Sequence, residues 1–374
     1  DGKITSNRYV RSAYRGFFTC ITPGKHLSGN SLAAAWRGGR IHLLSTSRML
    51  FGKKTKGFCV DFGDQAILLA RLSHENAPCG VEELKEFAPT DTESLQAFVK
   101  AAEGRGPTGY AHSRVGLYPP KRVVRRHTLD LKRIKDPAYF NEILSQQFRV
   151  EPERYRTLVL NPADGSEFDN TKTTQKEALF CGMPSEDIIA WQDKLLELGI
   201  YPERLELGTV ATLGALVSYL KFKQIKTPLL LLEMGDDATQ CFILSTDGVE
   251  ISRPIASGIA AMVPVVQKEL GLKDEESAKK LFYSNTFDFT SMGTTLIKKL
   301  LKELQSSIGF YEVQTGQSIG QVLCTHLPAN LSWLSTSLSN ALGVNTAKLE
   351  LVSWAESLGI TLAPGVALTG CGAG

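Results

Sequence analysis

The sequence lacks the long apolar run that a membrane-spanning helix requires. Its strongly apolar stretches are short, such as Pro228 to Leu232, whereas a spanning helix needs about 18 or more consecutive apolar residues. The 374 residues are 43% hydrophobic, a globular composition that excludes disorder throughout and leaves room for two or more cores. Any contact with a membrane is therefore expected to go through a partner or a surface.

The sequence also lacks paired cysteines. Its seven cysteines are scattered singly, at Cys20, Cys59, Cys79, Cys181, Cys241, Cys324 and Cys371. None forms a CxxC pair or lies in a Cys/His cluster with metal-ligand spacing, so no metal site is expected. Those at positions 59, 181, 241 and 324 lie in apolar, strand-like runs. They are expected to be small core residues in a reduced, cytosolic protein.

Acidic residues are almost missing from the first 57 positions, where eleven Lys or Arg face one acid, Asp1, for a charge of about +10. The rest of the chain has 31 basic and 38 acidic residues, about −7. An Arg-rich, acid-poor stretch is typical of a transit peptide, or of a basic arm for nucleic acid or anionic lipid. Met49 to Lys54 instead resembles a natural start. We therefore expect residues 1–48 to be a disordered or non-native leader, with a disordered functional arm as the alternative.

After residue 57 the local patterns predict an α/β chain. Short strands are expected at 58–62, 66–72, 84–88, 115–117, 157–161 and 178–182. A helix capped by Asp91 is expected at 91–104, before a break rich in Gly and Pro at 104–109. A second helix should begin with Ser185 as its cap and stop at Gly199. Farther along, helices are expected at 274–284, 291–316 and 331–342, and a strand at 321–325.

Two stretches of the sequence match one another. Asp61-Phe62-Gly63-Asp64 and Glu233-Met234-Gly235-Asp236 both follow a short apolar strand and precede a second β-type run. In the second stretch a hairpin turn at Asp247-Gly248 then leads into a strand over 249–255. This weak duplication predicts two similar α/β domains that face one another across a cleft.

A turn of this kind could hold phosphate. Glycine at the corner lets backbone N–H groups point into a concavity, and a carboxylate at the strand end could hold Mg²⁺ or orient water. A single Gly-Asp turn would indicate little, because most such turns are only turns. Two in matching context favour the fold more than they favour any ligand.

With these residues the chain resembles the PilM family of type IV pilus assembly proteins, which belongs to the actin-like superfamily and is related to FtsA. The resemblance covers Met49 to about residue 350. It rests on the order of several stretches: 49–63, Val115 to Pro119 with Arg125, 195–202, Arg253 to Ile255 with Gly258, 276–281 and 307–311. It implies an actin-like (ribonuclease H-like) fold of two duplicated α/β domains around a central cleft, with an FtsA-like inserted 1C subdomain.

The resemblance also implies subdomain limits. Subdomain 1A would comprise residues 49–105 and 206–226, and the inserted 1C residues 106–205. Subdomain 2A would comprise 227–270 and 321–374, with 2B at 271–320 between its parts.

The chain departs from the family at its nucleotide loops. In the first loop Asp61 and Gly63 are kept, but Asp64 follows in place of a hydroxyl residue, and its charge would repel phosphate. The third, Gly-Gly-Gly type loop is replaced by Thr325-His326-Leu327-Pro328-Ala329-Asn330. The degenerate nucleotide cleft is thus expected at Asp61, Gly63, Asp64, Glu233, Gly235, Thr239 and Gly258. We expect poor nucleotide binding, no catalytic residues and no metal, and His326 is expected to be an ordinary loop residue.

The function implied by the resemblance is that of a non-catalytic scaffold in the bacterial cytoplasm. In the PilM family an apolar tail of the bitopic inner-membrane protein PilN lies in a groove between 1A and 1C, and this binding requires no catalytic residue. The protein would then be peripheral to the inner membrane, which it would reach through that partner. No cofactor is expected, and self-association remains open.

Three alternatives remain open at this level. One is an ATP-binding or weakly ATP-hydrolysing protein of the same superfamily, with Mg-ATP at the degenerate cleft. A second is a GspL-like secretion component, which would usually continue into a membrane span. A third is nucleic-acid binding through residues 1–57, although no nucleic-acid partner is expected.

Overall fold

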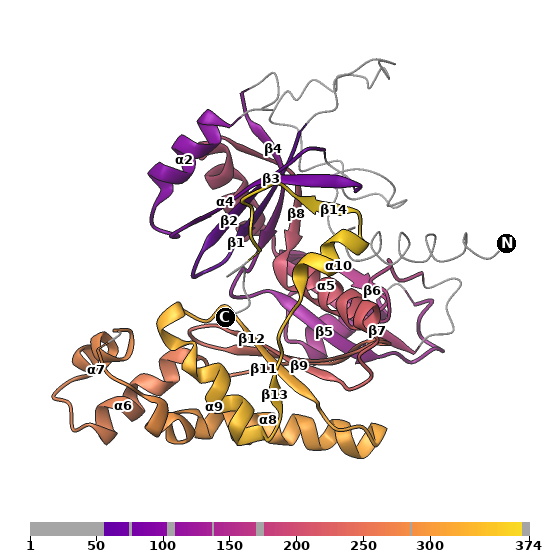
Figure 1. Ribbon diagram of the computed structural model, residues 1–374. Helices are drawn as coiled ribbons and strands as arrows, with labels where there is room; N and C mark the ends of the chain where they lie inside the picture. Colours follow the sequence, from indigo (N-terminus) through magenta and orange to yellow (C-terminus); the bar gives the residue numbers. More distant parts are fainter. Residues whose placement is uncertain are drawn as a thin grey trace.

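The computed structural model describes residues 56–74, 77–102, 109–136, 138–169, 176–284 and 286–368. The expected leader at 1–48, the start at Met49, Cys20 and Cys371 lie outside the described residues, and what was said of them stays a prediction. Figure 1 shows two large sheets one above the other, with a smaller third sheet beside the lower one. Helix α5 (Gly208–Lys223) lies between the two large sheets (Figure 1).

The first sheet has six strands in the order β14-β3-β2-β1-β4-β8. Its strands are β1 (Gly57–Phe62), β2 (Ile67–Leu72), β3 (Cys79–Phe87), β4 (Ala111–Leu117), β8 (Ile200–Leu207) and β14 (Ile360–Leu362). Alternate residues of β1, including Phe58 and Val60, face helices α2 (Thr92–Ala101) and α4 (Ser185–Glu197) in one core. The period-two pattern therefore turns one face of the sheet to these helices.

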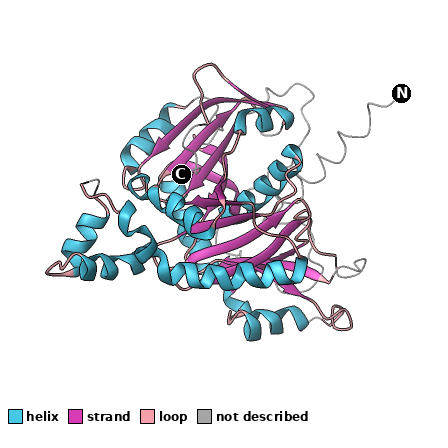
Figure 2. Cartoon of the chain, turned by 60° about the horizontal axis from the view of Figure 1, so that its bottom comes forward, coloured by secondary structure: helices cyan, strands magenta, loops and turns pink. Residues whose placement is uncertain are grey.

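The second sheet has five strands in the order β11-β10-β9-β12-β13. They are β9 (Leu229–Met234), β10 (Thr239–Ser245), β11 (Gly248–Ile255), β12 (Gln321–Thr325) and β13 (Asn345–Thr346). The helices of this half are α6 (Val263–Glu269), α7 (Glu275–Phe282), α8 (Gly293–Thr315) and α9 (Trp333–Leu342), whereas α10 (Leu351–Ser357) lies beside β14 and α5 (Figure 1). Helices α8 and α9 bury their apolar stripes on one core with β9, β10 and β12, and Figure 2 shows the long helix lying across this sheet.

The third sheet is antiparallel, in the order β5-β7-β6, and lies in sequence between β4 and β8. It consists of β5 (Val123–Thr128), β6 (Tyr155–Leu160) and β7 (Glu177–Pro184), with α3 (Tyr139–Glu142) and a π-helical turn, Ile143–Gln147, against one face. Helix α5 (Gly208–Lys223) packs against its other face and against the second sheet. This helix therefore packs the second and third sheets together in one core.

Some strands pair with strands from another of the residue ranges expected for the subdomains. Strand β4 and most of β8 fall within 106–205 but pair in parallel within the first sheet, so only β5, β6 and β7 form the inserted sheet. Strand β14 falls within 321–374 but pairs in parallel with β3. The limits of the subdomains themselves stay a prediction.

The duplicated turns have the same geometry. In β1–β2 the last pair is Phe62 with Ile67, and in β9–β10 it is Met234 with Thr239. The amide of Gly63 donates to the carbonyl of Ala66 at 3.1 Å, and that of Gly235 donates to Ala238 at 3.0 Å. Strands β1 and β9 each also pair in parallel with a later strand, β4 or β12. The predicted duplication is confirmed.

The helix ends agree with the sequence at one helix and differ at another. Asp91 caps α2 as expected, because its Oδ1 accepts from the Ser94 amide at 3.1 Å. Ser185 was expected to cap α4, but it is the first helical residue and Pro184 is the cap. Because β7 runs directly into α4, the Ser185 hydroxyl is buried and has no hydrogen-bond partner among the described residues. Beyond the helix, Gly199 has φ +80°, a left-handed conformation suited to glycine.

Candidate functional site

The candidate site lies where the two duplicated turns face one another. Asp61 is the penultimate residue of β1 and Glu233 the penultimate residue of β9, positions that the duplication makes equivalent. The pKa of Asp61 is raised chiefly by burial; the charge of His326 lowers it and that of Glu233 raises it, so the three groups share one region. The structure therefore brings the ends of β1 and β9 and the loop after β12 into one region.

Asp61 receives a hydrogen bond from a neutral group, the hydroxyl of Tyr118. Burial raises the pKa of Asp61, and this hydrogen bond opposes the shift. Two glycines make room for the pair. A Cβ at Gly116 would lie 2.9 Å from Asp61 Oδ1, and a Cβ at Gly208 would lie 2.1 Å from the Tyr118 ring. The tyrosine is thus packed directly onto the start of α5.

Glu233 is compensated by a cation instead. Its side chain is 1% exposed, and its Oε2 accepts from Arg122 at 2.9 Å and from the hydroxyl of Thr209 at 2.7 Å. Arg122 Nε also donates to Thr209 Oγ1, at 2.8 Å. Glu233 Oε1 is buried and has no partner among the described residues. A closed network of three side chains therefore surrounds one oxygen of this carboxylate.

The guanidinium of Arg122 is fixed on several sides. One of its nitrogens donates to the carbonyls of Tyr118, at 3.4 Å, and Pro119, at 3.2 Å. The group also lies over the Tyr118 ring, 5.7 Å from its centroid. Because Arg122 lies between β4 and β5 while Glu233 lies on β9, their ion pair connects the first and third sheets to the second.

His326 reaches across from the loop after β12 to the first turn. Its ring centroid lies 4.2 Å from that of Tyr118, and a Cβ at Gly63 would lie 3.6 Å from its Nδ1. The residue has φ +62°, a left-handed conformation for which glycine is the usual choice. The histidine side chain thus lies beside the first turn, from a position where the backbone favours glycine.

The second turn is bonded to the segment after β11. The amides of Ile259 and Ala260 donate to the carbonyls of Gly235 and Asp236, at 2.9 and 3.0 Å. A Cβ at Gly258 would lie 2.2 Å from the Asp236 carbonyl oxygen, so only glycine allows this approach. These amides, which begin the 3₁₀ helix Ile259–Met262, are therefore already used by the protein's own carbonyls.

Among the remaining expected residues, Thr239 is buried and donates its hydroxyl to the Ser257 carbonyl at 2.8 Å. Asp64 is exposed at the tip of the first turn. Sequence reasoning missed Arg122 and Thr209. Tyr118 lies in a stretch that carried the family resemblance, but nothing in the sequence indicated its contact with Asp61.

A pocket of about 220 Å³ opens beside the first turn. It is lined by Phe62, Gly63, Asp64, Ile67, Pro89, Tyr118, Pro119, Pro120, Trp191 and Lys194. The ammonium of Lys194 lies 4.6 Å from the Trp191 ring centroid and 5.9 Å from that of Phe62. The pocket is therefore aromatic and proline-rich, with one cation at its side.

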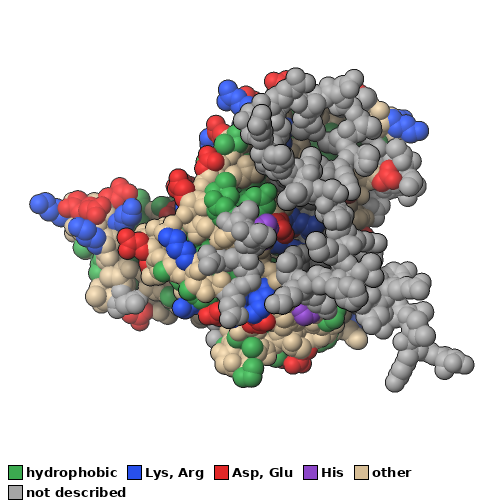
Figure 3. Space-filling view, turned by 90° about the horizontal axis from the view of Figure 1, so that it is seen from above, with side chains coloured by type: hydrophobic (Ala, Val, Ile, Leu, Met, Phe, Trp, Pro, Cys, Tyr) green, Lys and Arg blue, Asp and Glu red, His purple; other side chains and the backbone are tan. Residues whose placement is uncertain are grey.

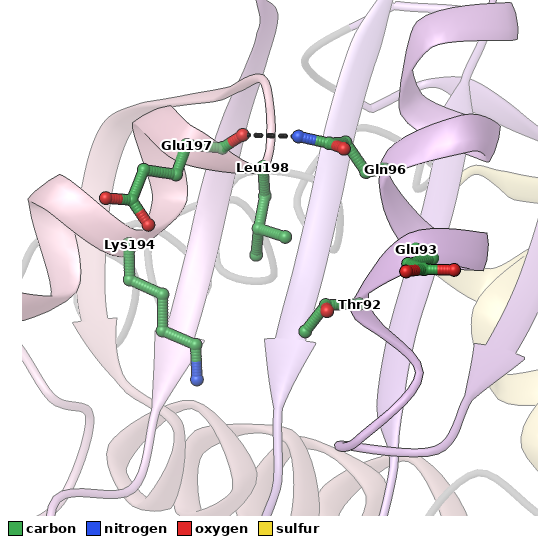
Figure 4. A pocket seen from close by; sticks show the side chains of 6 residues that line it. All are labelled: Thr92, Glu93, Gln96, Lys194, Glu197 and Leu198. Carbon is green, nitrogen blue, oxygen red and sulfur yellow. Dashed lines mark hydrogen bonds between the residues drawn. The ribbon is translucent and has the colours of Figure 1, made fainter.

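A second pocket, of about 240 Å³, lies between α2 and α4. Figure 4 shows it lined by Thr92, Glu93 and Gln96 of α2 and by Lys194, Glu197 and Leu198 from the α4 side. Gln96 closes one end by donating to the Glu197 carbonyl at 2.7 Å. Because Lys194 lines both pockets, they adjoin along α4.

Known protein structures resemble this arrangement. The chain is similar to the solved structure of a PilM-PilN type IV pilus biogenesis complex, with a TM-score of 0.57 and 14% identity over 85% of this chain and 93% of that one. The chain has the actin-like fold. The expected resemblance to PilM and the two duplicated domains are confirmed at the level of fold.

Two more distant structures were also found. A Bacteroides thetaiotaomicron protein with an actin-like ATPase fold and unknown function has a TM-score of 0.40, at 8% identity over 79% of this chain and 91% of that one. The ethanolamine utilization protein EutJ from Carboxydothermus hydrogenoformans has a TM-score of 0.35, at 11% identity over 79% and 85%. Neither a protein-family model nor a curated protein matches the chain.

Proposed function

We propose that this protein is a non-catalytic, actin-like scaffold of a type IV pilus-like assembly machine, which binds the cytoplasmic tail of a PilN-like inner-membrane partner. The likeness in fold to a chain of a PilM-PilN complex supports this role. In this proposal the protein works in the bacterial cytoplasm and reaches the inner membrane through its partner.

The observation that carries the proposal is the use of the cleft by the protein's own side chains. Where an actin-like nucleotide would place its phosphates, Arg122 compensates Glu233 and Tyr118 compensates Asp61. The amides after Gly258 are bonded to the second turn. A phosphate would have to compete with each of these contacts, since no described cation of this network is free to receive it.

The two adjoining pockets along α4 supply a groove for a partner tail. The aromatic and proline side chains of the pocket beside the first turn lie where that turn meets the segment that leads into the third sheet. An extended apolar peptide could place one side chain against Trp191 and Phe62 and continue past Lys194 toward α2. Such binding uses shape and backbone contacts and needs no catalytic group.

The test is a binding measurement with a labelled N-terminal peptide of a PilN-type protein. We expect saturable binding to the wild-type chain and little to a scrambled peptide. Trp191→Ala should weaken binding about tenfold or more, because it removes the aromatic wall of the groove. Trp354→Ala is the matched control, since Trp354 packs on Tyr219 of α5, away from both pockets. Equal binding of native and scrambled peptides would contradict the proposal.

An ATP-binding actin-like protein is the second candidate. The geometry that the two turns share favours it. Both turns keep the glycine amide and the preceding carboxylate at equivalent positions. Hydrolysis would further need a way to displace Arg122 from Glu233. Titration with fluorescent Mg-ATP separates the candidates, because the scaffold proposal needs no nucleotide.

The α6–α7 end of the molecule is not a basic patch of the kind that nucleic acid binds (Figure 3). In Figure 3 acidic and basic side chains alternate at the α6–α7 end, in line with the mixed sequence from Lys268 to Lys280. None of the described helices has the length and apolarity to cross a membrane. Within the same residues, no group of three His, Cys, Asp or Glu side chains could hold a metal ion.

A further inference from the structure

The edges of the second and third sheets meet at β11 and β5. Ser252 of β11 donates its hydroxyl to the Val124 carbonyl, and Arg126 of β5 donates to the Glu250 carbonyl. These two contacts show that the strands run antiparallel, since one residue number rises as the other falls. Figure 1 shows the two strands in the same region. Arg125 must then lie opposite Ile251, beside Arg253 on the same face.

Arg253 already has partners on α8. It donates to Glu303 Oε2 at 2.6 Å and to Ser307 Oγ at 2.9 Å. About 40% of each side chain of the Arg253–Glu303 pair remains exposed. The outer side of this ion pair is therefore open to solvent and to a further ligand.

Arg125 has no such partner. Within the described chain its guanidinium makes no hydrogen bond and no ion pair, and its contact is with the ring of Phe148, 5.8 Å from the centroid. Burial, and to a smaller extent the like charge of Arg253, lower the pKa of Arg125 to about 10. An arginine that loses water without gaining an anion is costly, and buried charges are normally paired.

We propose that Arg125 and Arg253 form a binding site for an oxyanion, a carboxylate or a phosphate, at the seam between β5 and β11. The planar guanidinium of Arg125 can donate two parallel hydrogen bonds to such a group. Glu303 and Ser307 hold Arg253 in place, and Glu303 balances much of its charge, so Arg253 adds mainly N–H donors on its exposed side while Arg125 supplies the unpaired charge. This site lies apart from the cleft and from the groove along α4, and it does not depend on the scaffold role.

Two sources could supply the oxyanion, and the surroundings favour a protein carboxylate over a free ion. Phe310 lies one turn beyond Ser307 on α8 and is 59% exposed, and Val313 in the next turn is 88% exposed. An acidic side chain of a partner could contact the arginine pair while its neighbours cover these apolar groups. Free phosphate would use the arginines alone.

The test is titration of the full chain with two probes, inorganic phosphate and the acetylated, amidated dipeptide Glu-Glu, at constant ionic strength. Binding is followed by calorimetry and by the NMR signals of arginine Nε–H groups. Arg125→Met should weaken binding of the preferred probe about tenfold or more, and Arg125→Lys should weaken it less. Arg154→Met is the matched control, because Arg154 is exposed and lies on the short 3₁₀ turn before β6.

The stability of the free protein provides a second measure. If Arg125 awaits an anion, Arg125→Met should leave the melting temperature unchanged or raise it, since an uncompensated charge is removed. Saturable binding of either probe that is lost in Arg125→Met supports the site, and the better probe identifies its source. Equal affinity of wild type and Arg125→Met for both probes would overturn the proposal.

Discussion

Asp61 and Glu233 occupy equivalent positions in the two duplicated units, yet the protein compensates them in different ways. Asp61 is matched by the neutral hydroxyl of Tyr118, and its pKa is raised by burial. Glu233 is matched by the charged guanidinium of Arg122 together with Thr209. The duplication thus reproduces the backbone frame, whereas side chains from outside each unit determine the electrostatics.

The same contrast extends to the turns. The residue that closes the first turn is the buried, apolar Ile67, and the one that closes the second is the buried, hydrogen-bonded Thr239. The second turn is also bonded through its carbonyls to the segment after Gly258, while His326 lies beside the first. The second turn is therefore held by polar contacts, whereas the first is closed by an apolar residue.

The largest effect is expected from Arg122→Met. This change leaves the Glu233 carboxylate buried with only Thr209 as a partner, so the free energy of unfolding should fall by about 3–5 kcal/mol. Urea denaturation measures the loss. The double variant Arg122→Met, Glu233→Met should recover most of it, because both charges are then absent. A single variant as stable as the wild type would show that the ion pair does not hold the sheets together.

Gly258→Ala should have the next largest effect. The new methyl would meet the Asp236 carbonyl oxygen, which is 2.2 Å from the Cβ position, and the second turn would have to move. We expect a loss of about 3 kcal/mol in thermal or urea unfolding. Gly309→Ala is the control, because its Cβ would meet no atom within 4 Å. Position 309 lies inside α8, where alanine has a higher helix propensity than glycine. The control should be neutral or slightly stabilising.

Asp61→Asn tests the first unit through pH. Burial raises the folded pKa of Asp61, so the folded state holds its proton more tightly than the unfolded state does. Stability from this group is therefore present below its ordinary pKa and is lost as pH rises through the raised value. Asp61→Asn should gain stability relative to the wild type across that window. Denaturation midpoints in a pH series would show this, and parallel profiles for the two proteins would contradict it.

The smallest effect compares the two closing residues directly. Thr239→Val removes one buried hydroxyl and leaves the Ser257 carbonyl without its donor, at a cost of about 1 kcal/mol. Ile67→Val removes one buried methylene at the equivalent position and should cost about 1 kcal/mol as well. Calorimetric melting of both variants measures the two losses of stability. A larger loss in Thr239→Val than in Ile67→Val would show that the polar contact contributes more than the apolar one.

Much of the frame could be predicted from local sequence. The acid-x-Gly-Asp pattern identified both turns, because glycine and a following polar residue are typical of tight turns. Strand β14 could not be placed, since its pairing with β3 joins residues far apart in sequence. Ser185 was misassigned because a cap requires a non-helical residue, and in the direct passage from β7 to α4 that residue is Pro184.

The site was predicted only in part. Asp61 and Gly63 in the first turn, and Glu233 and Gly235 in the second, belong to the duplicated pattern and were predicted from it. Arg122 was missed because its partner Glu233 is 111 positions away, and an isolated arginine in a loop gives no local signal. The groups that compensate a site thus come from tertiary structure, which one sequence does not display.

The most direct test of the central claim is a titration of the wild-type chain with fluorescent Mg-ATP. If Arg122, Tyr118 and the amides after Gly258 already use the cleft, no saturable binding should appear at micromolar nucleotide. Micromolar binding that is abolished by Gly235→Trp would contradict the account, because it would place a nucleotide at the second turn.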